Sequence, residues 1–171
     1  SLMWQLSTQT SQSFEDIMSL KTSRIIENQN SIYFSNNKNQ FYSIDLLTGS
    51  INWIQEINSD LKPSTIGNLL FTISLDGYFF IIDKNNGNIL RITSIFNNTK
   101  LRKKSGIYPT GFIFNHNDIF VTTSNGRLLI IDIKSGKIKK ILKIDNKKIS
   151  RPFVKYQNMY LIKDNSVIKL N

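Results

Sequence analysis

The stretch IDLLTGSINW, residues 44–53, decides the fold because its pattern recurs at two later places in the chain. Asp45 is followed four residues later by Gly49, and apolar residues flank the pair on both sides. An Asp carboxylate accepts hydrogen bonds from turn amides. A Gly adopts a positive φ that costs other residues about 1–2 kcal/mol. The stretch therefore predicts a tight turn between two β-strands.

Outward from this stretch, three segments of the chain align with one another: residues 31–57, 69–95 and 118–144. Their turn residues fall in register, and we interpret them as structural turns at Asp45 and Gly49, Asp83 and Gly87, and Asp132 and Gly136. The Asp residues are 38 and then 49 positions apart, and the extra length is an insertion around residues 97–107. Such self-similarity is typical of repeat architectures.

Each repeat is predicted to contain four short strands. A short first strand is expected before each aligned block, at Thr22–Ile26, Ser64–Ile66, Gly111–Phe114 and Pro152–Lys155. The third strands, residues 78–82 and 128–131, are nearly continuous apolar runs, which indicates burial on both faces. The fourth strand at residues 136–143 mixes lysines with Ile and Leu, as expected of an outer edge strand. A repeat of about 40 residues with four strands has the size of a β-propeller blade.

We therefore predict an all-β fold, a β-propeller of four-stranded antiparallel blades, with about four blades' worth of chain or half of an eight-bladed ring. Residues 1–171 are expected to form a single propeller fragment. Its approximate units are an outer strand of a preceding blade at 1–7, blades at 21–57, 62–95 and 109–144, and an incomplete last blade at 150–171. Two closures stay open, a small four-bladed ring or a homodimer that completes a larger ring. Blades cut for an eight-fold ring have the wrong wedge angle for four, which favours the dimer.

The charge of the chain has a compositional explanation. The formal net charge is +10, which is a feature of nucleic-acid-binding proteins. The chain also has 27 Ile, 20 Asn, 17 Lys and no Ala, a skew typical of AT-rich coding sequence, and its basic residues are spread along the chain. We therefore expect no nucleic-acid partner. The first residues lack the n- and h-regions of a signal peptide, so any export or lipidation signal is expected upstream.

The sequence contains no constellation that indicates catalysis. There is no Cys, and the only His is His116, in a predicted hairpin turn. Asp83 begins a stretch that resembles a calcium loop, but Ser94 stands where the bidentate Glu would be needed. The adjacent acidic pair Glu15 and Asp16 lies in a polar segment without a visible pocket. We expect no enzyme activity, no catalytic or metal-binding residues and no cofactor.

Residues 44–53 resemble the signature of the quinoprotein (PQQ-like) propellers, in which Ala-x-Asp-x-x-x-Gly-x-x-x-Trp recurs in each blade. The chain departs from this signature in two ways. The Trp position holds Trp53, Arg91 and Lys140, and the Ala position holds Ser43, Ile81 and Ile130. In the quinoprotein dehydrogenases the tryptophans form a girdle that locks the blades. A degraded girdle is typical of relatives that only bind other proteins.

The closing stretches, residues 150–161 and 164–170, are similar to the last blade of the BamB family, lipoproteins of the outer-membrane β-barrel assembly machinery. The resemblance implies a non-catalytic protein-binding scaffold at the periplasmic face of the outer membrane. It implies docking on the periplasmic domains of the central barrel-assembly protein, and membrane association only through upstream lipidation. Two alternatives stay open, a fragment of a quinone-cofactor-dependent dehydrogenase and a binder of anionic surfaces or nucleic acid.

The insertion between the second and third repeats is the candidate partner contact. It places the apolar Leu101 among Lys100, Arg102 and Lys103, a combination suited to an acidic partner surface. Loops of this kind usually carry the function of a rigid scaffold. A second long connection, residues 8–20, has Phe14 and Ile17 at helical spacing and predicts one short helical turn.

Overall fold

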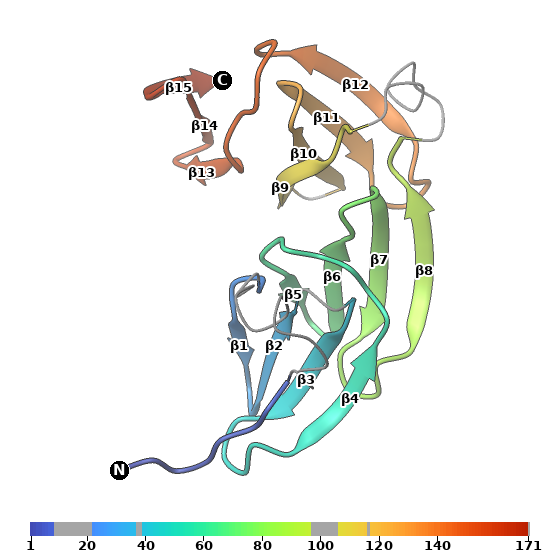
Figure 1. The fold of residues 1–171 in the computed structure, drawn as a ribbon. Helices are drawn as coiled ribbons and strands as arrows, with labels where there is room; N and C mark the ends of the chain where they lie inside the picture. The colour runs from blue at the N-terminus through green and yellow to red at the C-terminus, as the bar shows by residue number, and fades with distance from the viewer. Residues whose placement is uncertain (9–21, 37–38, 97–105, 116, 171) are drawn as a thin grey trace. The chain divides into compact units, whose positions relative to one another are not determined.

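The structure of the protein, a computed structural model, describes residues 1–8, 22–36, 39–96, 106–115 and 117–170. These residues form fifteen β-strands and no helix (Figure 1). The strands assemble into three four-stranded sheets and one three-stranded sheet, and consecutive strands are neighbours in each. The prediction of an all-β fold built from propeller blades is confirmed.

The first two sheets follow one another in the chain, and both have the order of a simple meander. The first contains β1 (Ile26–Asn28), β2 (Ser31–Ser35), β3 (Phe41–Asp45) and β4 (Ile51–Gln55). The second contains β5 (Ser64–Ile66), β6 (Leu69–Ile73), β7 (Tyr78–Asp83) and β8 (Ile89–Ser94). In both, the Asp–Gly turn joins the third strand to the fourth, as the repeat pattern predicts.

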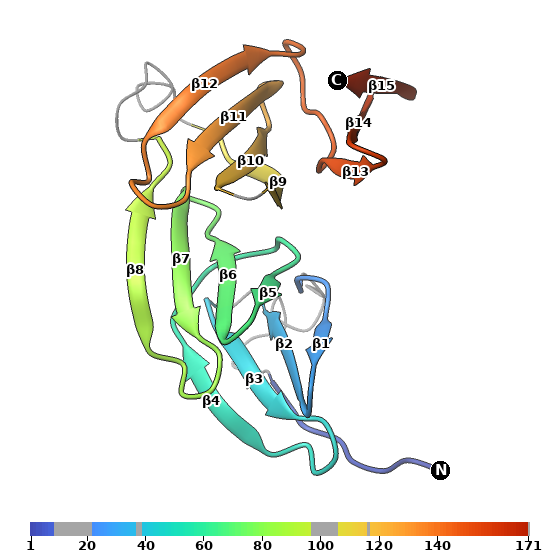
Figure 2. The same cartoon turned by 180° about the vertical axis from the view of Figure 1, so that it is seen from behind.

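The other two sheets use the rest of the chain and are seen from both sides in Figures 1 and 2. The third contains β9 (Pro109–Asn115), β10 (Asp118–Thr123), β11 (Arg127–Asp132) and β12 (Ile138–Lys143). The fourth contains β13 (Phe153–Lys155), β14 (Asn158–Lys163) and β15 (Ser166–Leu170). Lysine-rich β12 is the edge of its sheet, which confirms the predicted edge strand.

The chain divides into two compact units. The first comprises Ser1–Leu75 with Phe79–Ile92, and the second comprises Asp76–Tyr78 with Thr93–Asn171. In the first unit, large side chains from the first two sheets form one buried cluster: Tyr33, Phe41, Trp53, Ile57, Leu70, Phe80 and Ile82. This cluster is the packing interface between two blades. An inner strand of a blade needs apolar residues at successive positions, because its side chains alternate between the two faces of the sheet and both faces are covered.

The opposite face of the first sheet is also covered. Phe34, Tyr42 and Ile44 form a second buried cluster, against which Trp4 and Leu6 pack. The first residues of the chain therefore lie on the face where a preceding blade would sit. Residues 1–8 form no strand in the structure, since a strand needs a hydrogen-bonded neighbour.

The second unit is built around the third sheet. Five apolar side chains on its two middle strands are buried: Ile119, Val121, Leu128, Leu129 and Ile131. On the edge strand, Lys139 pairs with Asp118 at 2.6 Å and with Asp132 at 3.2 Å. Asp118 and Asp132 face each other across β10 and β11. One lysine of the edge strand therefore ties three strands together in addition to protecting the edge.

The first short strand lies elsewhere than expected. β1 is Ile26–Asn28 and not Thr22–Ile26. In the ladder between β1 and β2, Ile26 lies opposite Tyr33, so Arg24 would lie opposite Ser35 if the ladder continued. Instead, the Ser23 amide donates to the Ser35 carbonyl at 2.8 Å, which shifts the pairing by one residue. The Ser23 hydroxyl also accepts the Ser35 amide at 2.8 Å. This side-chain bond replaces a ladder bond, so the strand starts later. The predicted helical turn at Phe14 lies outside the described residues.

Candidate functional site

The Asp–Gly turns are held by hydrogen bonds from the Asp carboxylate. Asp45 Oδ1 accepts bonds from the Leu47 amide at 3.0 Å, the Thr48 amide at 2.8 Å and the Thr48 hydroxyl at 2.9 Å. Gly49 closes the turn, because its amide donates to the Asp45 carbonyl at 3.0 Å and its φ is +73°. The hydrogen bonds from Thr48 favour the ionised carboxylate and lower the pKa of Asp45.

The other two turns repeat this geometry with different donors. Asp83 Oδ1 accepts the Asn85 amide at 2.9 Å, and Asp132 Oδ1 accepts the Ser135 amide at 2.7 Å and hydroxyl at 2.8 Å. The bonds from Ser135, together with Lys139, lower the pKa of Asp132 to about 2. Gly87 and Gly136 have φ of +78° and +69°. The carboxylates of the predicted turn residues thus hold the backbone of their own turns.

A tryptophan packs on the turn glycine of the next repeat at two places in the first unit. A Cβ placed on Gly87 would lie 2.7 Å from Trp53 Cδ2, and one on Gly49 would lie 2.6 Å from Trp4 Cδ2. The Trp53 indole donates to the Lys84 carbonyl at 2.9 Å, and the Trp4 indole donates to the Leu46 carbonyl at 3.1 Å. The glycines are therefore required twice, for their positive φ and for the close approach of the ring.

In the second unit this contact is made differently. The residue that meets Gly136 is Thr93, whose Cγ2 would lie 2.3 Å from an added Cβ. The signature position counted from the preceding turn is Arg91, two residues earlier. The glycine is therefore kept where the tryptophan is lost, and a small β-branched side chain covers it.

A second set of backbone contacts also repeats, and sequence reasoning missed it. The residue after each turn Asp donates its amide to an Asn carbonyl in the turn between the first two strands of its own sheet. The pairs are Leu46 with Asn30 at 2.8 Å, Lys84 with Asn68 at 3.0 Å and Ile133 with Asn117 at 2.8 Å. The signal is present in the sequence, because an Asn stands directly before the second strand in all three repeats.

Of the three residues that donate these backbone bonds, Lys84 is the one with a charged side chain. Its side chain is only 4% exposed although it lies in a turn. Its ammonium donates to Asn28 Oδ1 at 2.6 Å and to Gln29 Oε1 at 3.2 Å. It lines a cavity of about 520 Å³ between the turns of the first and second sheets. We did not single out this residue from the sequence, in which it appears as one of many surface lysines.

The candidate partner contact, Lys100, Leu101, Arg102 and Lys103, lies outside the described residues, as does His116. No group of three or more His, Asp and Glu side chains suited to a metal ion occurs in the described ranges. Among the same residues, no helix has the length and apolarity needed to span a bilayer.

Comparison with solved structures shows the fold. BamB from Moraxella catarrhalis matches with a TM-score of 0.66 and 17% identity over 86% of this chain. The computationally designed protein Ika4 matches with a TM-score of 0.65 and 15% identity, over 86% of this chain and 91% of its own. A europium-containing methanol dehydrogenase matches over 68% of this chain and 23% of its own, with a TM-score of 0.52 and 18% identity. The chain spans 42% of the Moraxella protein.

The family is shown by sequence. Comparison with the curated proteins gives no match. The family model described as outer membrane protein assembly factor BamB matches residues 1–93, which is more than half of the 171 residues. These residues contain both Trp–Gly contacts, Trp4 with Gly49 and Trp53 with Gly87. The chain belongs to the BamB family of β-propeller proteins with PQQ-like repeats.

Proposed function

We propose that this chain is part of a non-catalytic, protein-binding scaffold that acts in the assembly of outer-membrane β-barrel proteins. The observation that carries the proposal is the family match over residues 1–93. The geometry agrees with it, because the repeated Asp and Gly residues are engaged in turns and blade contacts. We extend the proposal to location, at the periplasmic face of the outer membrane, with attachment through lipidation upstream of this chain.

The proposed partner is the set of periplasmic domains of the central barrel-assembly protein. The basic residues of the insertion, with Leu101 among them, suit an acidic partner surface. We propose the insertion as the contact, through Lys100, Leu101, Arg102 and Lys103. Electrostatic attraction of this kind raises the association rate and weakens as salt screens it.

The scaffold proposal is tested by direct binding. The purified parent protein is titrated onto immobilised periplasmic domains of the central barrel-assembly protein at about 0.15 M salt. The parent protein is expected to bind, and a variant with Lys100→Glu and Arg102→Glu is expected to bind at least about tenfold more weakly. The matched control carries Lys134→Glu and Lys137→Glu, the same charge change in the exposed turn before β12.

Three results are informative. Absence of binding by the parent protein contradicts the scaffold role. Equal weakening by both variants shows that the insertion contributes charge only and is not the contact. A quinone cofactor or nucleic acid that co-purifies with the parent protein from solubilised outer membranes, without the barrel-assembly protein, supports one of the alternatives instead.

The arrangement of the ring is part of the same proposal. β15 is the edge of a three-stranded sheet, which supports an incomplete last blade within residues 150–171. We propose that two copies of the chain complete a ring, with residues 1–7 as an outer strand. Light scattering is then expected to give twice the chain mass of 19.8 kDa, and a mass of one chain at all concentrations contradicts the dimer.

A further inference from the structure

The cavity beside Lys84 lies within the first unit and has a polar lining. It is about 520 Å³ in volume and is lined by Gln29, Asn30, Ser31, Tyr33, Asn52, Lys84 and Asn85. Four of these side chains are amides and two carry hydroxyls. Asn52 already donates its amide to Ser31 and Ser43 at 3.2 Å each, and Tyr33 donates its hydroxyl to the Lys84 carbonyl at 3.5 Å. The amide donors that remain for a ligand are those of Gln29, Asn30 and Asn85. Among the described residues, Lys84 is the only charged one in the lining, and no carboxylate of this part of the chain contributes to it.

The Lys84 ammonium lacks a counter-ion in the described part of the chain. Its acceptors, Asn28 Oδ1 at 2.6 Å and Gln29 Oε1 at 3.2 Å, are both neutral amide oxygens. An ammonium has three N–H donors, and these bonds use two of them. A buried charge is stable only when it is paired or well hydrogen-bonded, because its hydration is lost. The site therefore has one positive charge in excess.

The blade frame does not require this charge. The contacts that Lys84 makes within the frame come from its main chain, whose carbonyl accepts the Trp53 indole and whose amide donates to Asn68. The equivalent residues of the other two repeats are Leu46 and Ile133, which make the same amide contact and carry no charge. The side-chain bonds of Lys84 to Asn28 and Gln29 link the turns of the first two sheets, but these bonds need only a donor and leave the positive charge without a counter-ion.

We propose that this cavity binds a small organic oxyanion, a free carboxylate or phosphate compound, with the Lys84 ammonium as its counter-ion. The side-chain amides of Gln29, Asn30 and Asn85 suit the remaining oxygens of such a ligand. The volume lies within the range of about 300–1,000 Å³ that is usual for small-molecule sites. The proposal goes beyond the scaffold function and does not depend on it, since the cavity lies within residues 29–85 and the proposed partner contact does not.

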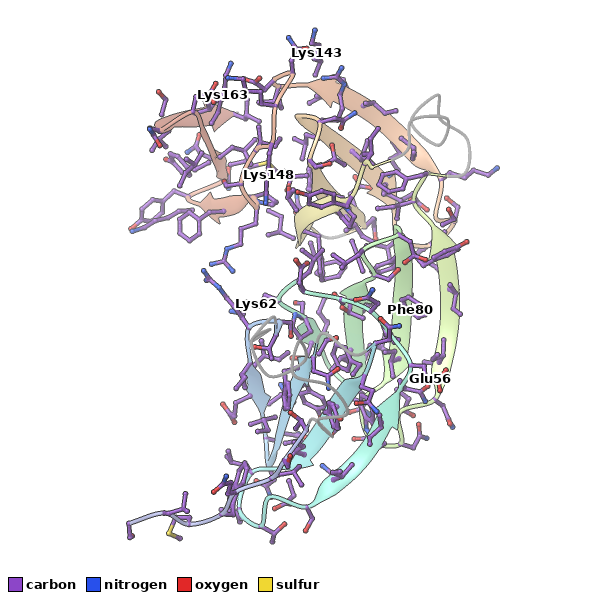
Figure 3. All side chains as sticks on the ribbon, viewed as in Figure 1. Glu56, Lys62, Phe80, Lys143, Lys148 and Lys163 are labelled. Carbon is purple, nitrogen blue, oxygen red and sulfur yellow. The ribbon has the colours of Figure 1, made fainter. Side chains whose placement is uncertain are left out.

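The test is isothermal titration of the purified chain with citrate and, separately, with inorganic phosphate, at constant ionic strength set by sodium chloride. At least one of the two anions is expected to bind the unaltered chain. Lys84→Met keeps most of the aliphatic stem and removes the charge, so the dissociation constant should rise by about tenfold or more. Lys62→Met is the matched control, because Lys62 is exposed in the same unit and extends away from its sheets (Figure 3). Binding by this control should be unchanged.

A second variant keeps the test decisive if Lys84→Met fails to fold. Asn52→Asp adds a carboxylate to the cavity lining and leaves Lys84 in place, and it is expected to abolish anion binding because the cavity then supplies its own counter-ion. Circular dichroism confirms that each variant is folded. The proposal is overturned if neither anion binds the unaltered chain at millimolar concentration, or if Lys84→Met and Lys62→Met bind equally well.

Discussion

The first and third sheets have the same strand plan but differ at the position of the signature tryptophan. In the first sheet, Ser43 on β3 lies directly opposite Trp53 on β4. In the third sheet, Ile130 on β11 lies directly opposite Lys140 on β12. Both pairs stand beside an irregularity in the ladder. The Ala position and the Trp position of the propeller signature therefore lie opposite each other on neighbouring strands. The Ala position holds the small Ser43 where the tryptophan is present, and the larger Ile130 where the tryptophan is replaced by Lys140.

A second difference lies one residue earlier on the fourth strand. Asn52 donates to the hydroxyls of Ser31 and Ser43 at 3.2 Å each. The corresponding residue of the third sheet is Lys139, which pairs with Asp118 and Asp132. Neutral hydrogen bonds in one sheet correspond to ion pairs in the other. The comparison shows that the Asp–Gly turns define the blade, while the contacts between strands and blades change freely around them.

The largest expected effect is loss of the Trp53 ring. Trp53 is 8% exposed, and its ring lies 6.0 Å from that of Tyr33 and 6.1 Å from that of Phe41. Trp53→Ala is expected to lower the free energy of unfolding by about 3–5 kcal/mol. Lys140→Ala, at the equivalent exposed position, is expected to leave it nearly unchanged. Urea denaturation followed by circular dichroism measures both, and equal losses contradict the comparison.

The next effect concerns the turn glycines. Gly87→Ala is strained in φ and places a Cβ 2.7 Å from a buried ring, whereas Gly67→Ala is strained in φ but has no atom within 4 Å. Gly67→Ala is expected to cost about 1–2 kcal/mol. Gly87→Ala is expected to cost about 1–3 kcal/mol more, as overpacking does. If the two variants unfold at the same urea concentration, the ring does not press on the turn as described.

The smallest effect is a pH dependence to which the ionic network of the third sheet contributes. The pKa of Asp132 is lowered from 3.8 to about 2 by bonds from Ser135 and by Lys139. A carboxyl group with a lowered pKa in the folded state stabilises the protein above its unfolded pKa, and that stability is lost as the pH falls toward the folded value. The urea midpoint should therefore fall between about pH 4 and pH 2.

Asp132→Asn should reduce this fall, because the amide does not titrate. The part that remains is expected to come from two groups. One is Asp45, whose pKa is lowered by its bonds from Thr48. The other is Asp145, whose pKa is lowered to about 2, mainly by its ion pair with Lys163 at 2.5 Å. Figure 3 shows Lys163 in the fourth sheet. A double variant, Asp132→Asn with Asp145→Asn, should show the weakest acid dependence. An unchanged fall in the double variant contradicts the assignment.

Much of the blade was predictable from the sequence because local chemistry controls it. The turns at Asp45, Asp83 and Asp132 follow from carboxylate–amide bonding and from the sterics of positive φ, which act within five residues. The start of β1 was not predictable, because it depends on the bond between Ser23 and Ser35 across a hairpin. The partner of Gly136 was not predictable either, since counting along the strand indicates Arg91 and the structure places Thr93 there.

By itself, the sequence determined the repeat, the strands, the turn residues and the family to which the chain belongs, because these depend on spacing and on residue type. Only the tertiary structure decided what the residues between the turns do. Lys84 and Lys134 occupy neighbouring positions in equivalent turns, and both read as surface lysines. One is buried beside a polar cavity and the other is exposed. The difference arises because burial depends on which side chains of another sheet pack against a turn. The positions of two residues in the sequence do not show whether such packing occurs.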